Sequence, residues 1–236
     1  WSILSYSLFT GLCYLATEPW HLAVMRFLAA LGMGGEWALG VALVMETWPE
    51  AKRPLMAGLI GAAANLGYCL IALIAIQFPI TPTSWRWVMM VGAAPAALTF
   101  LIRLFVPESE KWRESVRTRA AHPLREIFAA SLISRTLVGI GVASIPLIAT
   151  WGIVQWIPLW ADQLSGGRAP AVKAYTQLAQ SFGAVVGCLI APMLGNLLGR
   201  RALYCALCLC SLVACSVLFR GVHAYRTTFV TMVFCV

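Results

Sequence analysis

Three uncharged apolar stretches, each long enough to cross a bilayer, constrain the fold of this chain more than any other feature. They cover residues 55–76, 136–161 and 174–199, and about 20 apolar residues suffice for a helix to span the hydrocarbon core. Residues 1–17 and 202–219 are shorter stretches of the same kind. Because lipid offers backbone groups no hydrogen-bond partner, such stretches fold as helices. We therefore expect an all-α, polytopic membrane helix bundle.

Composition and charge agree with a membrane protein. Of the 236 residues, 61% are hydrophobic and 11% are charged, whereas about 25% are charged in soluble domains. The net charge of +8 does not indicate nucleic-acid binding, because Lys and Arg lie between the apolar stretches and form no aromatic-interleaved face. With the central polar stretch inside, eleven of the 17 Lys and Arg residues are cytoplasmic and Arg26 lies within the membrane. This asymmetry follows the positive-inside rule and predicts a multi-pass protein of the cytoplasmic (inner) membrane.

Turn residues divide the chain into consecutive helices. The polar stretch 107–135 separates residues 1–106 from residues 136–236, and its segment 124–134 has an amphipathic pattern that suits the membrane surface. The sequence begins at Trp1 without an initiator Met or a charged leader and ends inside the apolar run 228–236, so we expect an internal fragment of a longer protein. The expected helices are 1–16, 20–48, 55–78, 85–106, 136–160, 172–198 and 202–219, with an eighth starting near Tyr225.

The helix expected at 20–48 carries two charges that an apolar span does not need, Arg26 and Glu36. A carboxylate at the bilayer centre costs roughly 2.5–3.5 kcal/mol even on the lenient insertion scale, so a chain that keeps one usually uses it. Glu36 is about midway along this helix, and Gly32 and Gly40 lie four residues to either side on the same face. Small residues there allow another helix to approach the carboxyl group closely.

Four motifs resemble those of one family, the major facilitator superfamily of secondary transporters. Residues 26–37, RFLAALGMGGEW, are similar to the fourth transmembrane helix of its sugar, organic-acid and metabolite:proton symporters. Residues 46–58, ETWPEAKRPLMAG, resemble the loop that follows that helix, and residues 106–112, VPESEKW, resemble the end of the sixth helix. Residues 199–201, GRR, resemble the basic end of the loop between the eighth and ninth helices.

The resemblance implies a partial major-facilitator fold with about 7–8 of twelve helices, drawn from two six-helix bundles that rock around a central site. It implies that residues 1–106 belong to the N-terminal bundle, 107–135 to a cytoplasmic central loop with an amphipathic helix, and 136–236 to the C-terminal bundle. The implied function is alternating-access transport of a sugar, sugar acid or organic acid, by proton-coupled symport. The partners are then a small-molecule substrate, protons and the lipid bilayer, and the protein is expected to be monomeric.

The candidate residues follow from these motifs and from polar groups within apolar spans. Glu36 suits a proton carrier, or else a structural hydrogen bond to a neighbouring helix. Arg26 suits attraction of an anionic substrate, pairing with a carboxylate, or snorkelling to the interface. Gln155, Trp151 and Asn65 are candidates for substrate contact; the amide of Asn65, like those of Gln177 and Gln180, equally suits interhelical bonding. For the cytoplasmic gate the candidates are Glu46, Lys52, Arg53, Glu108, Arg200 and Arg201, and for helix packing Gly32, Gly34, Gly35 and Gly40.

Other functions remain as alternatives. An efflux antiporter of the same superfamily usually carries a Gly-Pro-rich fifth helix, and residues 58–73 contain no Pro. An enzyme is not expected, because His21, His122 and His223 form no Ser-His, HExxH or paired-carboxylate arrangement, and no metal or cofactor site is predicted. A non-transport membrane receptor is the remaining alternative.

Overall fold

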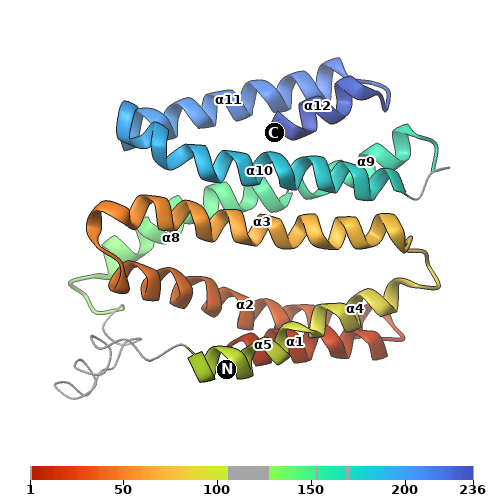
Figure 1. Cartoon of the computed structure of the whole chain (residues 1–236), viewed down its shortest axis with the longest axis horizontal. Coiled ribbons are helices and arrows are strands. Elements are labelled where there is room, and N and C mark those ends of the chain that lie inside the picture. Colours follow the sequence, from red (N-terminus) through yellow and green to blue (C-terminus); the bar gives the residue numbers. More distant parts are fainter. Residues whose placement is uncertain (1, 106–127, 153, 168–170, 236) are drawn as a thin grey trace. The chain divides into compact units, whose positions relative to one another are not determined.

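The computed structural model describes the whole chain except residues 1, 106–127, 153, 168–170 and 236, and the described residues form helices joined by short turns (Figure 1). Three of the turns are 3₁₀ helices, η1 (Cys13–Leu15), η2 (Glu50–Lys52) and η3 (Val154–Trp156). The α-helices are α1 (Ser2–Leu12), α2 (Pro19–Thr47), α3 (Arg53–Gln77), α4 (Trp85–Ala93), α5 (Pro95–Phe105), α8 (Ile133–Gly152), α9 (Ile157–Leu164), α10 (Ala171–Leu198), α11 (Arg200–Gly221) and α12 (Thr227–Cys235).

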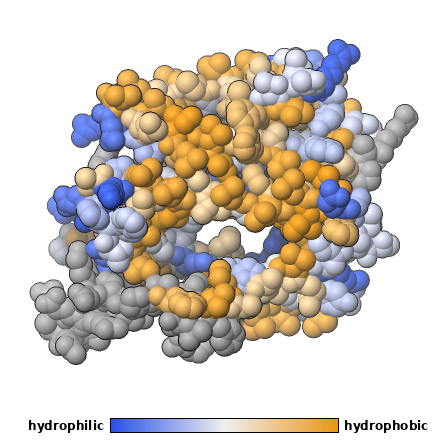
Figure 2. All heavy atoms as spheres, viewed as in Figure 1, coloured by the Kyte–Doolittle hydropathy of each residue, from blue (hydrophilic) through white to orange (hydrophobic). Residues whose placement is uncertain are grey.

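Four of the described helical segments are long and apolar enough to cross a membrane. They are Pro19–Thr47, Glu50–Gln77, Ala171–Leu198 and Arg201–Gly221, and only 6% to 22% of their most apolar windows is buried within the protein. Figure 2 shows apolar side chains along the lengths of the helices and hydrophilic ones gathered near the helix ends. Apolar helices that expose their sides in this way suit a lipid environment. The expected all-α membrane bundle is confirmed.

Two expected helices are interrupted. The helix expected at 85–106 divides at Ala94, because Pro95 has no N–H to donate and its ring clashes with the preceding turn. The Ala94 N–H instead bonds the Val91 carbonyl at 3.0 Å, which is the tighter 3₁₀ spacing. The helix expected at 136–160 ends at Gly152, and a new helix, with Pro158 in its first turn, runs on to Leu164. The prediction that each of these segments forms one continuous helix was therefore wrong.

The chain divides into two compact units. Unit 1 comprises residues 1–60 and 78–111, and unit 2 comprises residues 61–77 and 112–236, so that α3 contributes its first residues to unit 1 and the rest to unit 2. Most of the predicted central loop, 107–135, lies outside the described residues, and residues 128–132 of its predicted amphipathic segment form turns before α8 begins. The assignment of residues 1–106 and 136–236 to two six-helix bundles stays a prediction.

Unit 1 is organised around α1, which packs against α2, α4 and α5. The Arg86 guanidinium, at the start of α4, donates to the Ala16 carbonyl at 2.8 Å and lies 5.1 Å from the ring centre of Trp85. This bond satisfies a carbonyl just beyond the η1 turn, where a helical end leaves acceptors unpaired. Arg86 therefore joins the end of the first helical segment to the start of α4.

Unit 2 is organised around α10, which packs against α9, α11 and α12. Aromatic rings fill the space between these helices: Trp160 stacks on Phe219 at 5.1 Å and meets Phe229 edge-on at 5.3 Å. Trp160 therefore packs against the core of this unit. The buried residues of this core are Ile157, Ala161, Val172, Leu218, Phe229 and Val233.

Candidate functional site

Glu36 lies near the middle of α2 and is half-buried in unit 1. Its carboxyl group lies near the phenol of Tyr6 on α1. One turn earlier, Gly32 brings the two helices together, because a Cβ there would lie 2.9 Å from the Tyr6 nitrogen and 3.1 Å from the Ser2 carbonyl oxygen. The neighbouring helix α1 thus approaches α2 most closely one turn before Glu36.

The remaining glycine candidates on α2 make no such contact. A Cβ on Gly34, Gly35 or Gly40 would meet no described atom within 4 Å. Among the described residues, the close approach of a second helix to α2 is therefore seen at Gly32 and not at these three positions. The helix-packing role proposed for Gly34, Gly35 and Gly40 stays a prediction.

Arg26 is exposed at the other half of α2, ten residues before Glu36. Within the described part of the chain it forms no ion pair. The guanidinium therefore keeps its hydrogen-bond donors available for an anion or for water.

The predicted gate residues lie mostly on exposed turns. Arg53 bonds within its own loop, to the Glu50 carboxylate at 3.1 Å and to the Trp48 carbonyl at 3.4 Å. Glu46, in the last turn of α2, and Lys52, in η2, are exposed. Glu50, which the sequence motif did not single out, is therefore the observed partner of Arg53. Arg201 is exposed in the first turn of α11, which Arg200 opens, and Glu108 lies outside the described residues.

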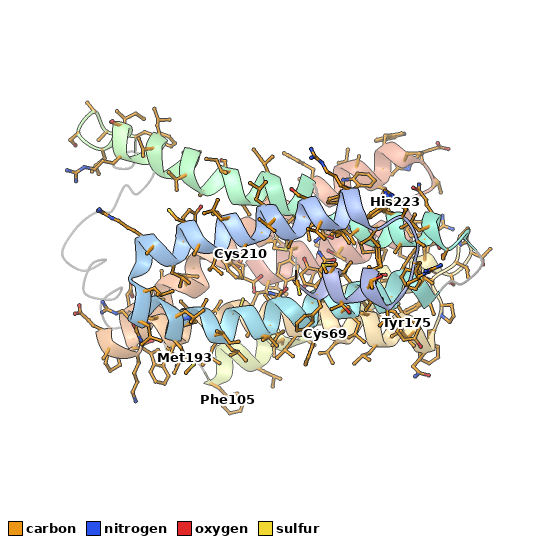
Figure 3. All side chains as sticks on the ribbon, turned by 90° about the horizontal axis from the view of Figure 1, so that it is seen from above. Cys69, Phe105, Tyr175, Met193, Cys210 and His223 are labelled. Atoms are coloured by element: carbon orange, nitrogen blue, oxygen red, sulfur yellow. The ribbon has the colours of Figure 1, made fainter. Side chains whose placement is uncertain are left out.

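A pocket of about 510 Å³ in unit 2 brings together the three predicted substrate-contact residues. Asn65 comes from the middle of α3, Trp151 from the end of α8 and Gln155 from η3. Cys210, another lining residue, lies about midway along α11 (Figure 3). The further polar and thiol-bearing residues of the wall are Tyr68, Gln177, Gln180, Ser181, Ser211, Cys215 and Cys235.

The interruption between α8 and α9 forms one side of this pocket. Val154 and Gln155 lie in the 3₁₀ turn, where the regular helical hydrogen bonds are lost. Gln180 on α10 donates its amide Nε2–H to the Val154 carbonyl at 3.3 Å, while its Oε1 is buried without a partner among the described residues. Swapping the two amide atoms would place an oxygen against the carbonyl, so the bond determines which way the amide points.

The pocket wall is neutral but rich in hydrogen-bonding groups. Two amides already use a donor, Asn65 to the Gly61 carbonyl at 2.9 Å and Gln177 to the Ser181 hydroxyl at 3.0 Å. Their amide oxygens remain as acceptors, and the rings of Trp151 and Tyr68 add flat apolar surfaces. Among the described lining residues there is no Asp, Glu, Lys, Arg or His. Such a wall suits the hydroxyl groups and ring faces of a small polar molecule.

Sequence reasoning missed Tyr6 and Tyr68. Each is a single Tyr in an apolar helix, which is equally typical of an interfacial anchor. The available signal for Tyr68 was its position three residues after Asn65, which places both on one face of α3. For Tyr6 there was no comparable signal, because Glu36, near which it lies, is thirty positions away on another helix.

We predict that Gln180→Leu destabilises the interruption between α8 and α9. The substitution leaves the Val154 carbonyl without its donor, and a lost hydrogen bond of this kind costs about 1 kcal/mol. The thermal midpoint of the full-length protein in detergent should fall by a few degrees. Gln163→Leu, at an exposed position of α9, is the matched control, and an equal fall in both variants would contradict the prediction.

Comparison with known proteins gives a consistent result over the whole chain. The family model of the Major Facilitator Superfamily matches residues 1–236. The inner membrane metabolite transport protein YgcS of Escherichia coli is 26% identical over 226 residues, which cover 85% of this chain and 50% of that protein. The sialic acid transporter NanX of Escherichia coli is 26% identical over 201 residues, covering 85% and 49%.

A third relative has a different named substrate. The cis,cis-muconate transport protein of Acinetobacter baylyi is 25% identical over 219 residues, which cover 86% of this chain and 51% of that protein. The chain therefore spans about half the length of these curated relatives. No solved structure matches it significantly.

Proposed function

The chain belongs to the Major Facilitator Superfamily and is a multi-pass protein of the cell membrane, and from this we propose that the full-length protein is a secondary active transporter. It moves a small polar metabolite by alternating access, with the substrate bound between helices near the middle of the bilayer. The two six-helix bundles to which residues 1–106 and 136–236 are assigned rock around that site. Symport with protons is the proposed coupling.

The pocket of unit 2 is the observation that carries this proposal. Its lining residues on α3, α10 and α11 fall in the middle parts of those helices, which is the depth of a substrate site in a membrane-spanning bundle. Its volume of about 510 Å³ falls within the usual range for small-molecule sites. Amides and aromatic rings in a neutral wall support a sugar, a sugar acid or an organic acid as the substrate.

The relatives support the same range of substrates. One is named for sialic acid, which is a sugar acid, and one for muconate, which is a dicarboxylic acid. An acidic substrate needs a cation, and in unit 1 Arg26 has donors available for one. We assign to Arg26 the attraction of an acidic substrate into the transporter, and the hydroxyl groups or the ring of the bound substrate to the pocket of unit 2.

The remaining charged candidates take two roles in this proposal. Glu36 carries the proton, because it is a half-buried carboxyl group near the middle of α2 that forms no ion pair among the described residues. On the cytoplasmic side, Glu46, Lys52 and Arg53, together with Glu108, Arg200 and Arg201, close the inward path. The observed Arg53–Glu50 pair spans the loop between α2 and α3.

Uptake into proteoliposomes containing the full-length protein tests the proposal. The probes are a radiolabelled hexose, a hexuronic acid, a dicarboxylic acid and an aromatic carboxylic acid, each with an alkaline interior imposed. We expect at least one probe to accumulate above its external concentration. This accumulation should disappear when a protonophore is added. Accumulation only under the reverse gradient would indicate an efflux antiporter, and no movement of any probe would favour a receptor or an enzyme.

We predict that Gln155→Ala weakens binding of the transported probe in the same assay. Loss of one hydrogen bond of about 1 kcal/mol corresponds to roughly a fivefold increase in KM. The matched control is Gln163→Ala, because Gln163 is exposed and does not line the pocket. An unchanged KM for Gln155→Ala would remove Gln155 from the proposed site.

A further inference from the structure

An apolar groove in unit 1 has no part in the proposed function. It lies between α1 and the pair α4 and α5, which run beside each other (Figure 1), and its volume is about 750 Å³. The described lining residues fall within 4–12 and 90–96, and the polar ones among them are Ser5 and Ser7. Leu8 and Met90 on its walls are 59% and 55% exposed, so the groove is open to the surroundings of the protein. Such a wall suits hydrocarbon better than a polar metabolite, because it replaces few of the hydrogen bonds that a polar group makes with water.

A cation lies at one end of this groove. Arg86 precedes Met90, the first described lining residue of α4, by four positions, which places both on one face of that helix. On the other wall, Ala16 follows Leu12, the last described lining residue of α1, also by four positions. The Arg86 guanidinium donates to the Ala16 carbonyl at 2.8 Å. The guanidinium therefore joins the two walls just beyond the last apolar side chains.

The residues around Arg86 place this end of the groove at the level of the lipid head groups. Trp85 and Trp87 stand on either side of Arg86 in the sequence, and Trp is enriched where a membrane protein meets the membrane–water interface. From Arg86 to Ala96, the last described lining residue, a helical chain rises about 15 Å. This is half of the roughly 30 Å hydrocarbon core. The groove thus has the depth of one lipid leaflet, with the cation at the membrane surface.

Arg86 keeps hydrogen-bond donors for an anion. Its bond to Ala16 uses one of the several N–H groups that a guanidinium carries. Within the part of the chain that the structure describes, Arg86 takes part in no ion pair. Phosphate oxygens are acceptors that a guanidinium binds strongly, often through two parallel bonds. The charge at the end of the groove therefore complements a phosphate group.

We propose that this groove binds one anionic phospholipid, with its phosphate on Arg86 and one acyl chain lying between α1 and the pair α4 and α5. Each part of the site corresponds to one part of that lipid. A free phosphate ion would leave the apolar walls uncovered, and an uncharged lipid would leave the guanidinium without its anion. The inference requires only that the chain lies in a membrane, so it does not depend on which substrate the protein transports.

Lipid titration of the full-length protein in detergent tests the cation. Phosphatidylglycerol is added to delipidated protein, and bound lipid is counted by native mass spectrometry. We expect one phosphatidylglycerol to bind, and Arg86→Gln to weaken its affinity roughly fivefold, as the loss of one cation at a membrane surface predicts. Arg86→Lys keeps the charge and should keep most of the affinity. Arg226→Gln, which removes an exposed cation from unit 2, is the matched control and should have no effect.

A second pair of variants tests the groove without touching the charge. Ala96→Phe places a ring in the space of the acyl chain and should abolish this binding, whereas Ala97→Phe, at an exposed position that does not line the groove, should not. Thermal midpoints measured without lipid show that both variants are folded. Unchanged affinity in both Arg86→Gln and Ala96→Phe, or an equal loss in the two control variants, would overturn the inference.

Two further probes separate the possible occupants. Phosphatidylcholine with the same acyl chains carries no net charge and should bind more weakly, and glycerol 3-phosphate, which has no acyl chain, should not bind detectably. Equal affinities for the two lipids would remove the role of the cation, and tight binding of glycerol 3-phosphate would indicate a site for a free anion. If the wild type binds no phosphatidylglycerol and Ala96→Phe lowers the thermal midpoint without lipid, a protein segment fills the groove. Each of these three outcomes contradicts the inference.

Discussion

Replacing Glu36 with Gln is expected to abolish proton-driven accumulation while sparing exchange of substrate between the two sides. The amide keeps the shape of the side chain but cannot carry a proton across the membrane. For one proton per substrate, a gradient of two pH units supports about 100-fold accumulation, since every 1.4 kcal/mol is a factor of ten. The variant should therefore only equilibrate the substrate, which is measured as the final internal to external ratio in proteoliposomes.

Glu50→Gln is the matched control for this experiment. The substitution removes the same charge, but from a side chain that is 87% exposed and pairs with Arg53 across a surface turn. Surface pairs of this kind contribute about 0–1 kcal/mol, so accumulation should remain near the wild-type level. Proton-driven accumulation that persists in Glu36→Gln would show that another group, or another ion, couples transport.

The second large effect is expected at Gly183, where α10 meets α12 within unit 2. A Cβ added there would overlap the Phe234 carbonyl oxygen, and the atoms it meets belong to backbone rather than to a flexible side chain. Because backbone cannot rotate away, Gly183→Ala must separate the two helices. Overpacking of this kind costs about 1–3 kcal/mol, and we expect the thermal midpoint of the full-length protein to fall by several degrees.

Gly187→Ala distinguishes this contact from a general effect of glycine replacement. Gly187 lies one turn further along α10, and a Cβ there meets no atom within 4 Å. Ala is also the better helix former by about 1 kcal/mol, so this variant should be as stable as the wild type or more so. A Gly183→Ala protein with the thermal midpoint of Gly187→Ala would contradict the close contact with Phe234.

Several features of this protein could be read from the sequence because they depend on composition along one helix. Uncharged stretches such as 55–76 must satisfy their own backbone in lipid, so the helices and the membrane-protein class follow from length and hydropathy. Glu36 stood out for the same reason, as a charge in an apolar run. The family also followed, because its motifs lie in short local segments.

The tertiary structure alone decided which side chains meet. Pro158 was visible in the sequence, but the break before it is held by Gln180, an amide twenty-six positions after Val154. Likewise, α1 and α2 come together because Gly32 lets the two backbones approach, a contact that no periodicity along either helix encodes. Hydropathy along one helix predicts whether that helix lies in lipid or in water. The partners of a buried polar group depend instead on how separate helices pack.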